Sequence, residues 1–296
     1  MGVESGQVVN YTVVSDLFVF GLRASYLVAM IKKRFEHRSE LLKTFYRELN
    51  RRRYVHPDPV EFLYDYNDRR DREIVALVAS SLAYGRVKQI LRSVQNVLDK
   101  LGPNPSGWLM GASRLEIRRT MRRLPRHRFA TGEQIGAMLL GAKSVIASYG
   151  SLEACFANGL RSKDETILPA LGEFVGRIIE ASKGGCGHLL PDPTRGSACK
   201  RPNLMLRWLV RCDKVDPGGW SCVGTDKLII PLDTHMHNIA LTLGMTKRKA
   251  ADMRTALEVT AAFAKILPSD PVRYDFALTR LGIRNEMTVA DLFDIW

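Results

Sequence analysis

The sequence predicts an all-α fold, and three observations favour it. Apolar residues recur at spacings of three and four along most of the chain, glycines and prolines separate these stretches, and no run of alternating apolar and polar residues indicates a sheet. Only residues 227–232 are weakly strand-like, and Pro231 argues against a strand there because proline has no N–H to donate. We therefore expect helices throughout.

The first half of the chain predicts a series of helices separated by short breaks. Residues 31–49 carry apolar positions among charges at helical spacing. Asp58 is placed to cap a short helix with Pro59 at its first position. Residues 74–82 and 87–98 form two apolar stripes, joined by a tight corner at Tyr84-Gly85-Arg86 because glycine favours the end of a helix.

The second half continues in the same way. Glycine or serine near the ends of the helical stretches indicates where each one starts or stops. A loop rich in proline and glycine (residues 215–227) interrupts the series. The helices predicted here span residues 132–150, 151–160, 167–184, 200–210, 234–244, 246–267 and 270–282.

The amino-acid composition limits the classes of protein and of binding partner that fit this sequence. At 296 residues, with 46% hydrophobic and 25% charged residues, the chain can bury a sizeable core, which excludes a largely disordered protein. Forty-four Lys and Arg against 31 Asp and Glu leave a net charge of +13. Such an excess favours a polyanionic partner, because neutralised phosphates release condensed counterions. The alternative is a basic protein kept soluble by its charge.

The five cysteines indicate reduced thiols in a cytoplasmic protein. They are odd in number and widely spread, and no C-x2-C pair indicates a zinc ribbon or an iron–sulfur cluster, so we expect no cofactor. Residues 13–31 are apolar but contain Asp16 and Arg23, and they match neither a transmembrane span nor a signal peptide. Translation from Met30 is an alternative, so residues 1–29 are interpreted as an extension to a helical region, 30–296.

Residues 104–130 hold the densest positive charge. A helix through this segment would place several arginines on one face at spacings of three and four. Either they contact phosphates or they form a solvated face paired with carboxylates elsewhere, and the sequence leaves both open. The arginines are Arg114, Arg118, Arg119, Arg122, Arg123, Arg126 and Arg128.

Lys200 and Asp233 are the candidate reactive pair. Asp233 precedes a helix, so its simplest role is an N-cap, but a capping carboxylate is also a rigid counter-charge for a cation. Lys200 follows the small residues Gly196 and Ser197 at a helix start, where backbone amides can approach a phosphate. A desolvated lysine amine is a nucleophile.

His235 and His237 raise the alternative of a metal site. Together with Asp233 they form an Asp-x-His-x-His pattern. Alternate residues diverge on a helix, however, and no further ligands cluster nearby, so we expect no metal.

A family resemblance follows from the same residues. The segment GSACKRPNLMLRWLV, followed by PLDTHMHNIA, resembles the signature of the helix-hairpin-helix DNA glycosylases, which include endonuclease III and the 8-oxoguanine glycosylases. The similarity covers roughly residues 40–285 and is closer still to a group of bacterial and archaeal proteins of unknown function assigned to that superfamily. It implies a two-lobed helical bundle with the active site between the lobes.

The resemblance assigns roles by position. Lys200 corresponds to the nucleophilic lysine and Asp233 to the catalytic aspartate. The residues that would contact DNA are Gly196, Ser197, Arg201, His235 and Arg86. Those expected near the inserted base are Ser80, Ser81, Tyr84 and Arg86, with Trp208 and Trp220 as further candidates for stacking. For the three aromatic candidates, packing in the core is the alternative.

The chain departs from the family pattern in three ways. The hairpin before Lys200 lacks one glycine of the expected pair, and residues 190–198 read LPDPTRGSA. Lys200 and Asp233 are 33 residues apart, longer than in compact members, because VDPGGWSCVGTDK intervenes. The four-cysteine cluster of endonuclease III is absent from the sequence.

The implied function is base-excision repair. A damaged base, with 8-oxoguanine among the candidates, would be flipped out of double-stranded DNA and released as Lys200 forms a Schiff base, and β-elimination would then nick the strand. We expect a monomer, cytoplasmic and associated with the nucleoid, without membrane contact. Two alternatives stay open: a non-catalytic helical protein that binds DNA or RNA, and a metal-dependent hydrolase using Asp233, His235 and His237.

Overall fold

The computed structural model describes residues 39–280, and it confirms the all-α fold: this range contains helices and no strand. Contacts divide the chain after Thr44, and residues 45–280 belong to a single compact unit. The proposed extension, residues 1–29, lies outside the described residues, as does the start of the helix predicted over 31–49. The division into two lobes stays a prediction.

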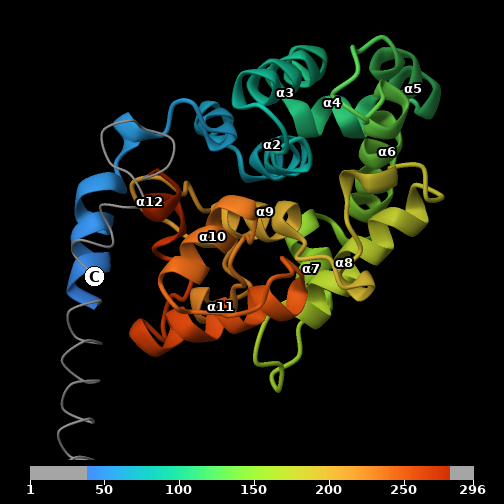
Figure 1. Ribbon diagram of the computed structural model, residues 1–296. Helices are drawn as coiled ribbons and strands as arrows, with labels where there is room; N and C mark the ends of the chain where they lie inside the picture. Colours follow the sequence, from blue (N-terminus) through green and yellow to red (C-terminus); the bar gives the residue numbers. More distant parts are fainter. Residues whose placement is uncertain (1–38, 281–296) are drawn as a thin grey trace, which may run out of the picture. The chain divides into compact units, whose positions relative to one another are not determined.

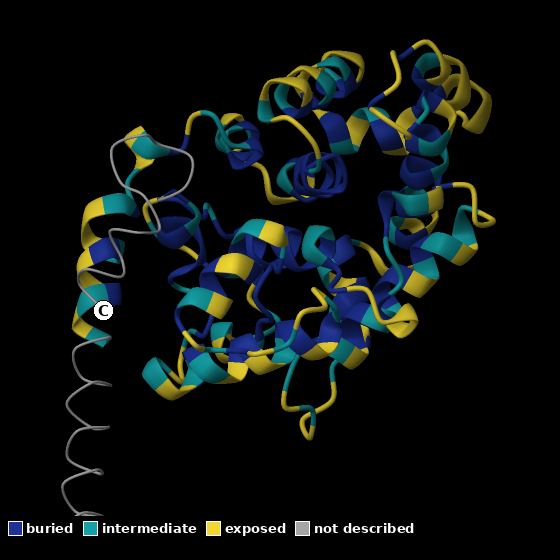
Figure 2. Ribbon diagram, viewed as in Figure 1, coloured by how far each residue is buried: buried dark blue, intermediate teal, exposed yellow. Residues whose placement is uncertain are grey.

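Helix α2 (Arg69–Ser81) lies at the centre of the core (Figures 1 and 2). Asp68 caps it by accepting hydrogen bonds from the amides of Arg70 and Asp71, at 2.8 and 3.2 Å. Residues 74–81 are apolar or small and all are buried, because α2 packs against α9 (Lys200–Val210) and the 3₁₀ helix η2 (Pro59–Asp65). Asp58 caps η2 as predicted, with its carboxylate 3.1 Å from the Val60 amide.

The corner after α2 leads into helices that stay partly exposed. Gly85 has a φ of 97°, a conformation that favours glycine, and it turns the chain into α3 (Val87–Leu101). Helices α4 (Pro105–Gly111) and α5 (Arg114–Arg122) follow. The chain begins α5 with a capping box in which Ser113 and Glu116 satisfy each other's backbone amides, and α5 buries only Ile117 and Met121.

Helix α6 (Gly132–Tyr149) packs closely on α5 and α8 (Leu168–Ala181), with α7 (Leu152–Asn158) beside it. A Cβ atom at Gly141 would lie 2.5 Å from the Ile178 carbonyl oxygen, so only glycine allows α6 and α8 to approach this closely. No single helix of the described residues has the length and apolar character needed to cross a bilayer; α6 and α7 together, bent by 69°, meet both criteria.

Three helices, α10 (Thr234–Thr242), α11 (Met253–Ile266) and α12 (Asp275–Arg280), close the described part of the chain. Asp233 caps α10, which packs on α12. The helix predicted over 246–267 begins only at Met253, because Asp252 caps it by accepting from the Thr255 amide at 2.9 Å. The helix predicted over 270–282 likewise begins later, at Asp275.

Residues 39–49 are α-helical, in agreement with the described part of the helix predicted over 31–49. Within residues 50–280, the remaining helices are short 3₁₀ turns in the connections. They are η1 (Arg52–Tyr54), η3 (Gly187–Leu189), η4 (Pro193–Arg195) and η5 (Thr225–Lys227).

Candidate functional site

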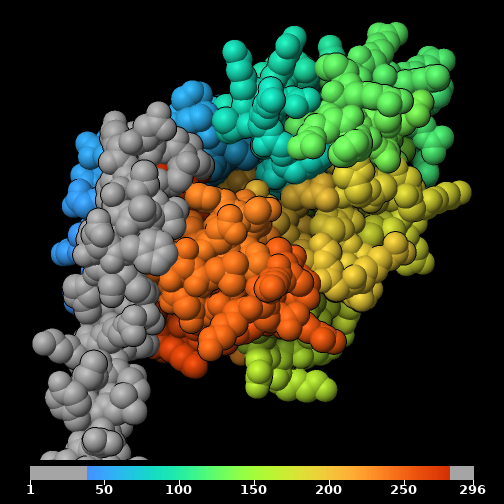
Figure 3. Space-filling model, viewed as in Figure 1, coloured from blue at the N-terminus to red at the C-terminus, as the bar shows by residue number. Residues whose placement is uncertain are grey.

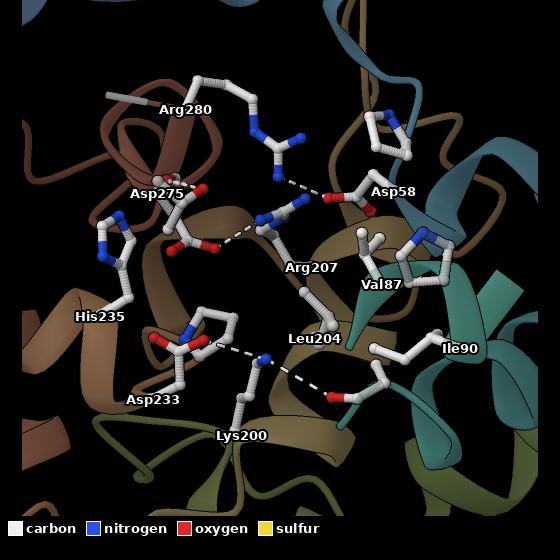
Figure 4. A pocket seen from close by; sticks show the side chains of 15 residues that line it. Asp58, Val87, Ile90, Lys200, Leu204, Arg207, Asp233, His235, Asp275 and Arg280 are labelled. Carbon is white, nitrogen blue, oxygen red and sulfur yellow. Dashed lines mark hydrogen bonds and ion pairs between the residues drawn. The ribbon is translucent and has the colours of Figure 1, made fainter. Parts of the chain in front are cut away.

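Lys200 and Asp233 form an ion pair where two helices begin. Lys200 is the first residue of α9, and its Nζ lies 3.0 Å from Asp233 Oδ2 (Figure 4). Asp233 Oδ1 accepts a hydrogen bond from the Met236 amide at 2.9 Å, so one carboxylate both caps α10 and holds the amine. The amine also donates to the Ala83 carbonyl oxygen, at 3.4 Å. Contacts with two other segments of the chain thus hold the amine in position.

The surroundings keep the Asp233 carboxyl group ionised. Burial on its own would raise its pKa, but the charge of Lys200 and the Met236 amide act in the opposite direction and leave the pKa below its usual value. Both side chains are 32% exposed, so solvent and ligands can reach the pair. A fixed amine and a fixed carboxylate are therefore accessible together.

Two cavities meet at this pair. An inner cavity of about 280 Å³ lies on one side and an outer groove of about 560 Å³ on the other. Both are lined by Lys200, Asp233, His235, Ala83 and Ile90. A molecule lying in the outer groove can therefore place one group in the inner cavity, past the amine.

The inner cavity has an apolar and a charged wall. Leu204, Val87 and Ile90 form part of the apolar wall (Figure 4). The charged wall holds Arg280, whose guanidinium donates to Asp58 at 2.8 Å, and Asp275, which is bonded to Arg207. A flat heterocycle fits this combination, because its faces can lie on apolar groups while its edge meets polar ones.

Behind the charged wall lies a buried ionic cluster that the sequence did not indicate. Arg207 binds Asp275 and Asp216, the latter at 3.1 Å, and Asp216 also binds Arg211. Burial raises the pKa of the Asp275 carboxyl group, and the nearby Arg207 offsets this only in part. Arg207, Arg211 and Asp216 lie within nine residues of one another, but Asp275 is 68 residues from Arg207, and no local pattern connects it to them.

The outer groove is bordered by the irregular hairpin before α9. Gly196 has a φ of 78°, and its carbonyl oxygen accepts from the Met253 amide at 3.0 Å, which ties the hairpin to α11 (Met253–Ile266). Cys199 adopts a φ of 48° and makes no side-chain cap for α9. The first-turn amides of α9 therefore lack a side-chain acceptor, a setting that suits an anion.

Tyr84 and Arg201 are held together at the edge of the outer groove. The Arg201 guanidinium lies 4.9 Å from the centre of the Tyr84 ring and donates to the carbonyl oxygens of Ser81 and His188. Desolvation lowers the pKa of Arg201, and Tyr84 partly offsets this. The Tyr84 hydroxyl donates to the His127 carbonyl oxygen at 3.1 Å. Because backbone carbonyl oxygens hold its guanidinium, Arg201 fixes the position of the Tyr84 ring.

Of the other residues predicted for DNA contact, the structure brings two to the cavities. Ser197 lines the outer groove, and His235 lines both cavities. The Nε2 atom of His235 is buried without a hydrogen-bond partner in the described chain, and Figure 4 places the ring toward Asp275. Arg86 is exposed at the start of α3, two residues from Tyr84. Gly196 shapes the hairpin and lines neither cavity.

Several residues expected in the base pocket lie elsewhere. Trp208 is completely buried in α9, and Trp220 is 5% exposed, donates to Glu73 at 2.9 Å and packs on Phe156. Ser80 donates to the Leu77 carbonyl oxygen within α2. None of these three side chains lines the cavities at Lys200, because each faces the core. Ser81, which is fully buried, does not line them either.

His237 also lies away from the pair. Its Nε2 atom is 2.8 Å from the Arg248 carbonyl oxygen, and the residue is buried. His235 and His237 therefore diverge on α10, as expected for alternate residues of a helix.

A comparison with known protein families places the chain in one of them. A family model matches residues 58–284, more than half of the 296-residue chain. The chain belongs to this family, DUF2400. The family is described as a protein of unknown function, and its matched range includes Asp58, Lys200, Asp233 and Arg280. No curated protein and no solved structure matches the chain. Membership in the glycosylase superfamily stays a prediction.

Proposed function

We propose that the protein is a DNA glycosylase with an associated lyase activity, which removes a damaged base from duplex DNA through a Schiff base at Lys200. The observation that carries this proposal is the 3.0 Å contact of Lys200 Nζ with Asp233, at the junction of two cavities. The resemblance of residues 196–210 and 231–240 to the helix-hairpin-helix DNA glycosylases supports it. The two-lobed organisation of that superfamily is part of the proposal.

The two cavities suit a flipped nucleotide. The backbone of the strand would lie in the outer groove, near the uncapped start of α9, and the base would enter the inner cavity past Lys200. The net charge of +13 favours the phosphate backbone as partner. In this arrangement the sugar carbon C1′ lies beside the amine.

The chemistry uses one amine and one carboxylate. The free amine of Lys200 attacks C1′, the bond to the base breaks, and the base leaves with the proton lost by the amine. The C1′–O4′ bond then breaks as O4′ takes up a proton, which opens the sugar ring and leaves a protonated Schiff base between C1′ and the lysine nitrogen. Loss of a proton from C2′ and cleavage of the C3′–O bond nick the strand, with the phosphate as leaving group, and water then releases the lysine. Asp233 has a lowered pKa and is thus a weak base, so its larger role is to stabilise positive charge on the sugar.

Borohydride trapping tests the proposal, because it reduces a Schiff base to a stable covalent bond. Duplexes would carry an abasic site, 8-oxoguanine, uracil or an oxidised pyrimidine. We expect an adduct with wild-type protein that disappears in Lys200→Gln. Lys100→Gln, which removes an exposed lysine at the end of α3, is the matched control and should keep the adduct.

The result also separates the alternatives. No adduct with any duplex, from folded protein that binds DNA, would overturn the glycosylase and favour the non-catalytic binding protein. An adduct that persists in Lys200→Gln would place the nucleophile elsewhere. The duplex trapped fastest would identify the lesion.

A further inference from the structure

A second groove lies on the exposed side of α5, and we call it the α5 groove. It measures about 620 Å³ and shares no lining residue with the two cavities at Lys200. The segment that holds it, in light green, lies open at the upper right of Figure 3. Its lining residues are Arg118, Arg122, Phe129, Thr131, Glu133, Gln134, Ala137, Ser182 and Gly185.

The α5 groove carries positive charge that the protein itself leaves largely unbalanced. Residues 113–133 contain seven arginines and two glutamates, and all seven arginines are exposed. Glu116 is engaged by the capping box of α5, and Glu133 pairs with Arg122 at 3.2 Å. In the described part of the chain, no other arginine of this segment has an ion-pair partner. A polyanion would supply the missing counter-charge.

Phe129 projects from the edge of the α5 groove. It is 73% exposed, more than any other large apolar side chain in the described residues. The turn that presents it is closed by two backbone hydrogen bonds between His127 and Ala130, of 3.0 and 2.9 Å. Arg128, in the same turn, has a φ of 53° and lies 5.6 Å from the Phe129 ring. A non-glycine residue in this conformation is strained, so the turn that exposes the Phe129 ring to water costs conformational free energy.

We propose that the α5 groove binds an unpaired strand of DNA, with one base stacked on Phe129 and its phosphates at Arg118 and Arg122. An aromatic ring beside arginines is the combination that single-strand binding sites use, because the ring stacks on any base while the cations neutralise the backbone. An unpaired strand is the favoured occupant, since the faces of paired bases are covered by their neighbours in a duplex. Arg122 would exchange Glu133 for a phosphate.

The inference goes beyond the chemistry at Lys200 and does not rest on it. It is therefore tested by binding, in the full chain carrying Lys200→Gln, so that strand cleavage cannot contribute. Fluorescence anisotropy would compare a blunt duplex with the same duplex bearing an unpaired tail.

Phe129→Ala should weaken binding of the tailed duplex roughly tenfold, from the loss of one stacked base, and leave the blunt duplex within about twofold. Phe129→Tyr keeps the ring and should bind like the parent. Arg118→Gln with Arg122→Gln should reduce the salt dependence of tail binding, by roughly 0.7 in log–log slope for each lost contact. Lys163→Gln, which removes an exposed charge between α7 and α8, is the matched charge control and should leave the preference for the tail unchanged.

Two results would overturn the inference. One is an equal loss on blunt and tailed duplexes in Phe129→Ala, which would indicate a duplex surface. The other is no loss on either, which would leave Phe129 without a nucleic-acid partner. Neither result bears on the trapping experiment, so the two proposals fail separately.

Discussion

Two sets of ion pairs involve residues of the same helix, α9, and differ in exposure and in number of partners. The Arg207–Asp216–Asp275 cluster is almost inaccessible, with side-chain exposures of 4, 0 and 3%, and its arginine binds two carboxylates. Lys200 and Asp233 form a single pair, each about a third exposed. Burial and several partners make the first set structural, whereas the exposure of Lys200 and Asp233 leaves that pair accessible to a ligand.

Replacing Arg207 should disrupt the buried cluster. Arg207→Met leaves Asp216 and Asp275 buried without their shared cation, and we expect a loss of about 3–5 kcal/mol in the free energy of unfolding. Urea denaturation would measure it. Arg161→Met, which breaks the exposed contact with Glu173 at 3.3 Å, is the control and should cost less than about 1 kcal/mol. Equal losses would contradict the contrast between closed and open pairs.

The second prediction separates the two roles of Asp233. Asp233→Ala removes both the cap of α10 and the ion pair, whereas Asn retains a capping oxygen. We expect Ala to cost about 1 kcal/mol more than Asn in the free energy of unfolding, because that is the usual contribution of a cap. A cost that is the same for both variants would show that capping contributes nothing here.

The same variants predict a pH dependence. The folded-state pKa of Asp233 is below its unfolded value, so the charged carboxylate stabilises fully above the usual aspartate range and loses this effect as the pH falls through the lowered pKa. The stability difference between wild type and Asp233→Asn should therefore be constant from about pH 7 to 5 and shrink near pH 3. A stability difference that grows on acidification would contradict this prediction.

The smallest effect is expected at the α5 groove. Arg122 and Glu133 are 77 and 67% exposed, and Arg122→Gln should change the free energy of unfolding by no more than about 0.5 kcal/mol. Thermal or urea unfolding would check this. A larger loss would mean that this pair supports the fold, and that any binding defect of the variant has a second cause.

The sequence predicted that Lys200 and Asp233 share a pocket because both residues stand at helix starts, which are local signals. Asp233 follows an apolar stretch and precedes a helix, and Lys200 follows a run of small residues. The corner at Gly85 and the cap at Asp58 were predicted for the same reason. Where a glycine, a proline or a capping side chain determines the backbone conformation, the residues adjacent in sequence are sufficient to predict the local structure.

Features that depend on distant residues could not be predicted in this way. Trp208 and Trp220 are aromatic residues near the pair in sequence, but both are buried in the core. Arg207 lies in an apolar helical stretch, and nothing there indicates that it meets Asp275, 68 residues later. Phe129 also lacked a signal, since its exposure depends on a turn with a positive φ at Arg128, a residue that seldom adopts it.

The contact of Arg280 with Asp58 has a consequence for protein synthesis. The two residues are 222 positions apart, so at a usual elongation rate Asp58 leaves the ribosome roughly 10–45 s before Arg280 does. Both line the inner cavity. A nascent chain therefore contains Lys200 and Asp233 before Arg280 is synthesised and can complete this wall of the cavity. A chain interrupted before Arg280 would carry the Lys200 amine beside a cavity that lacks part of its charged wall.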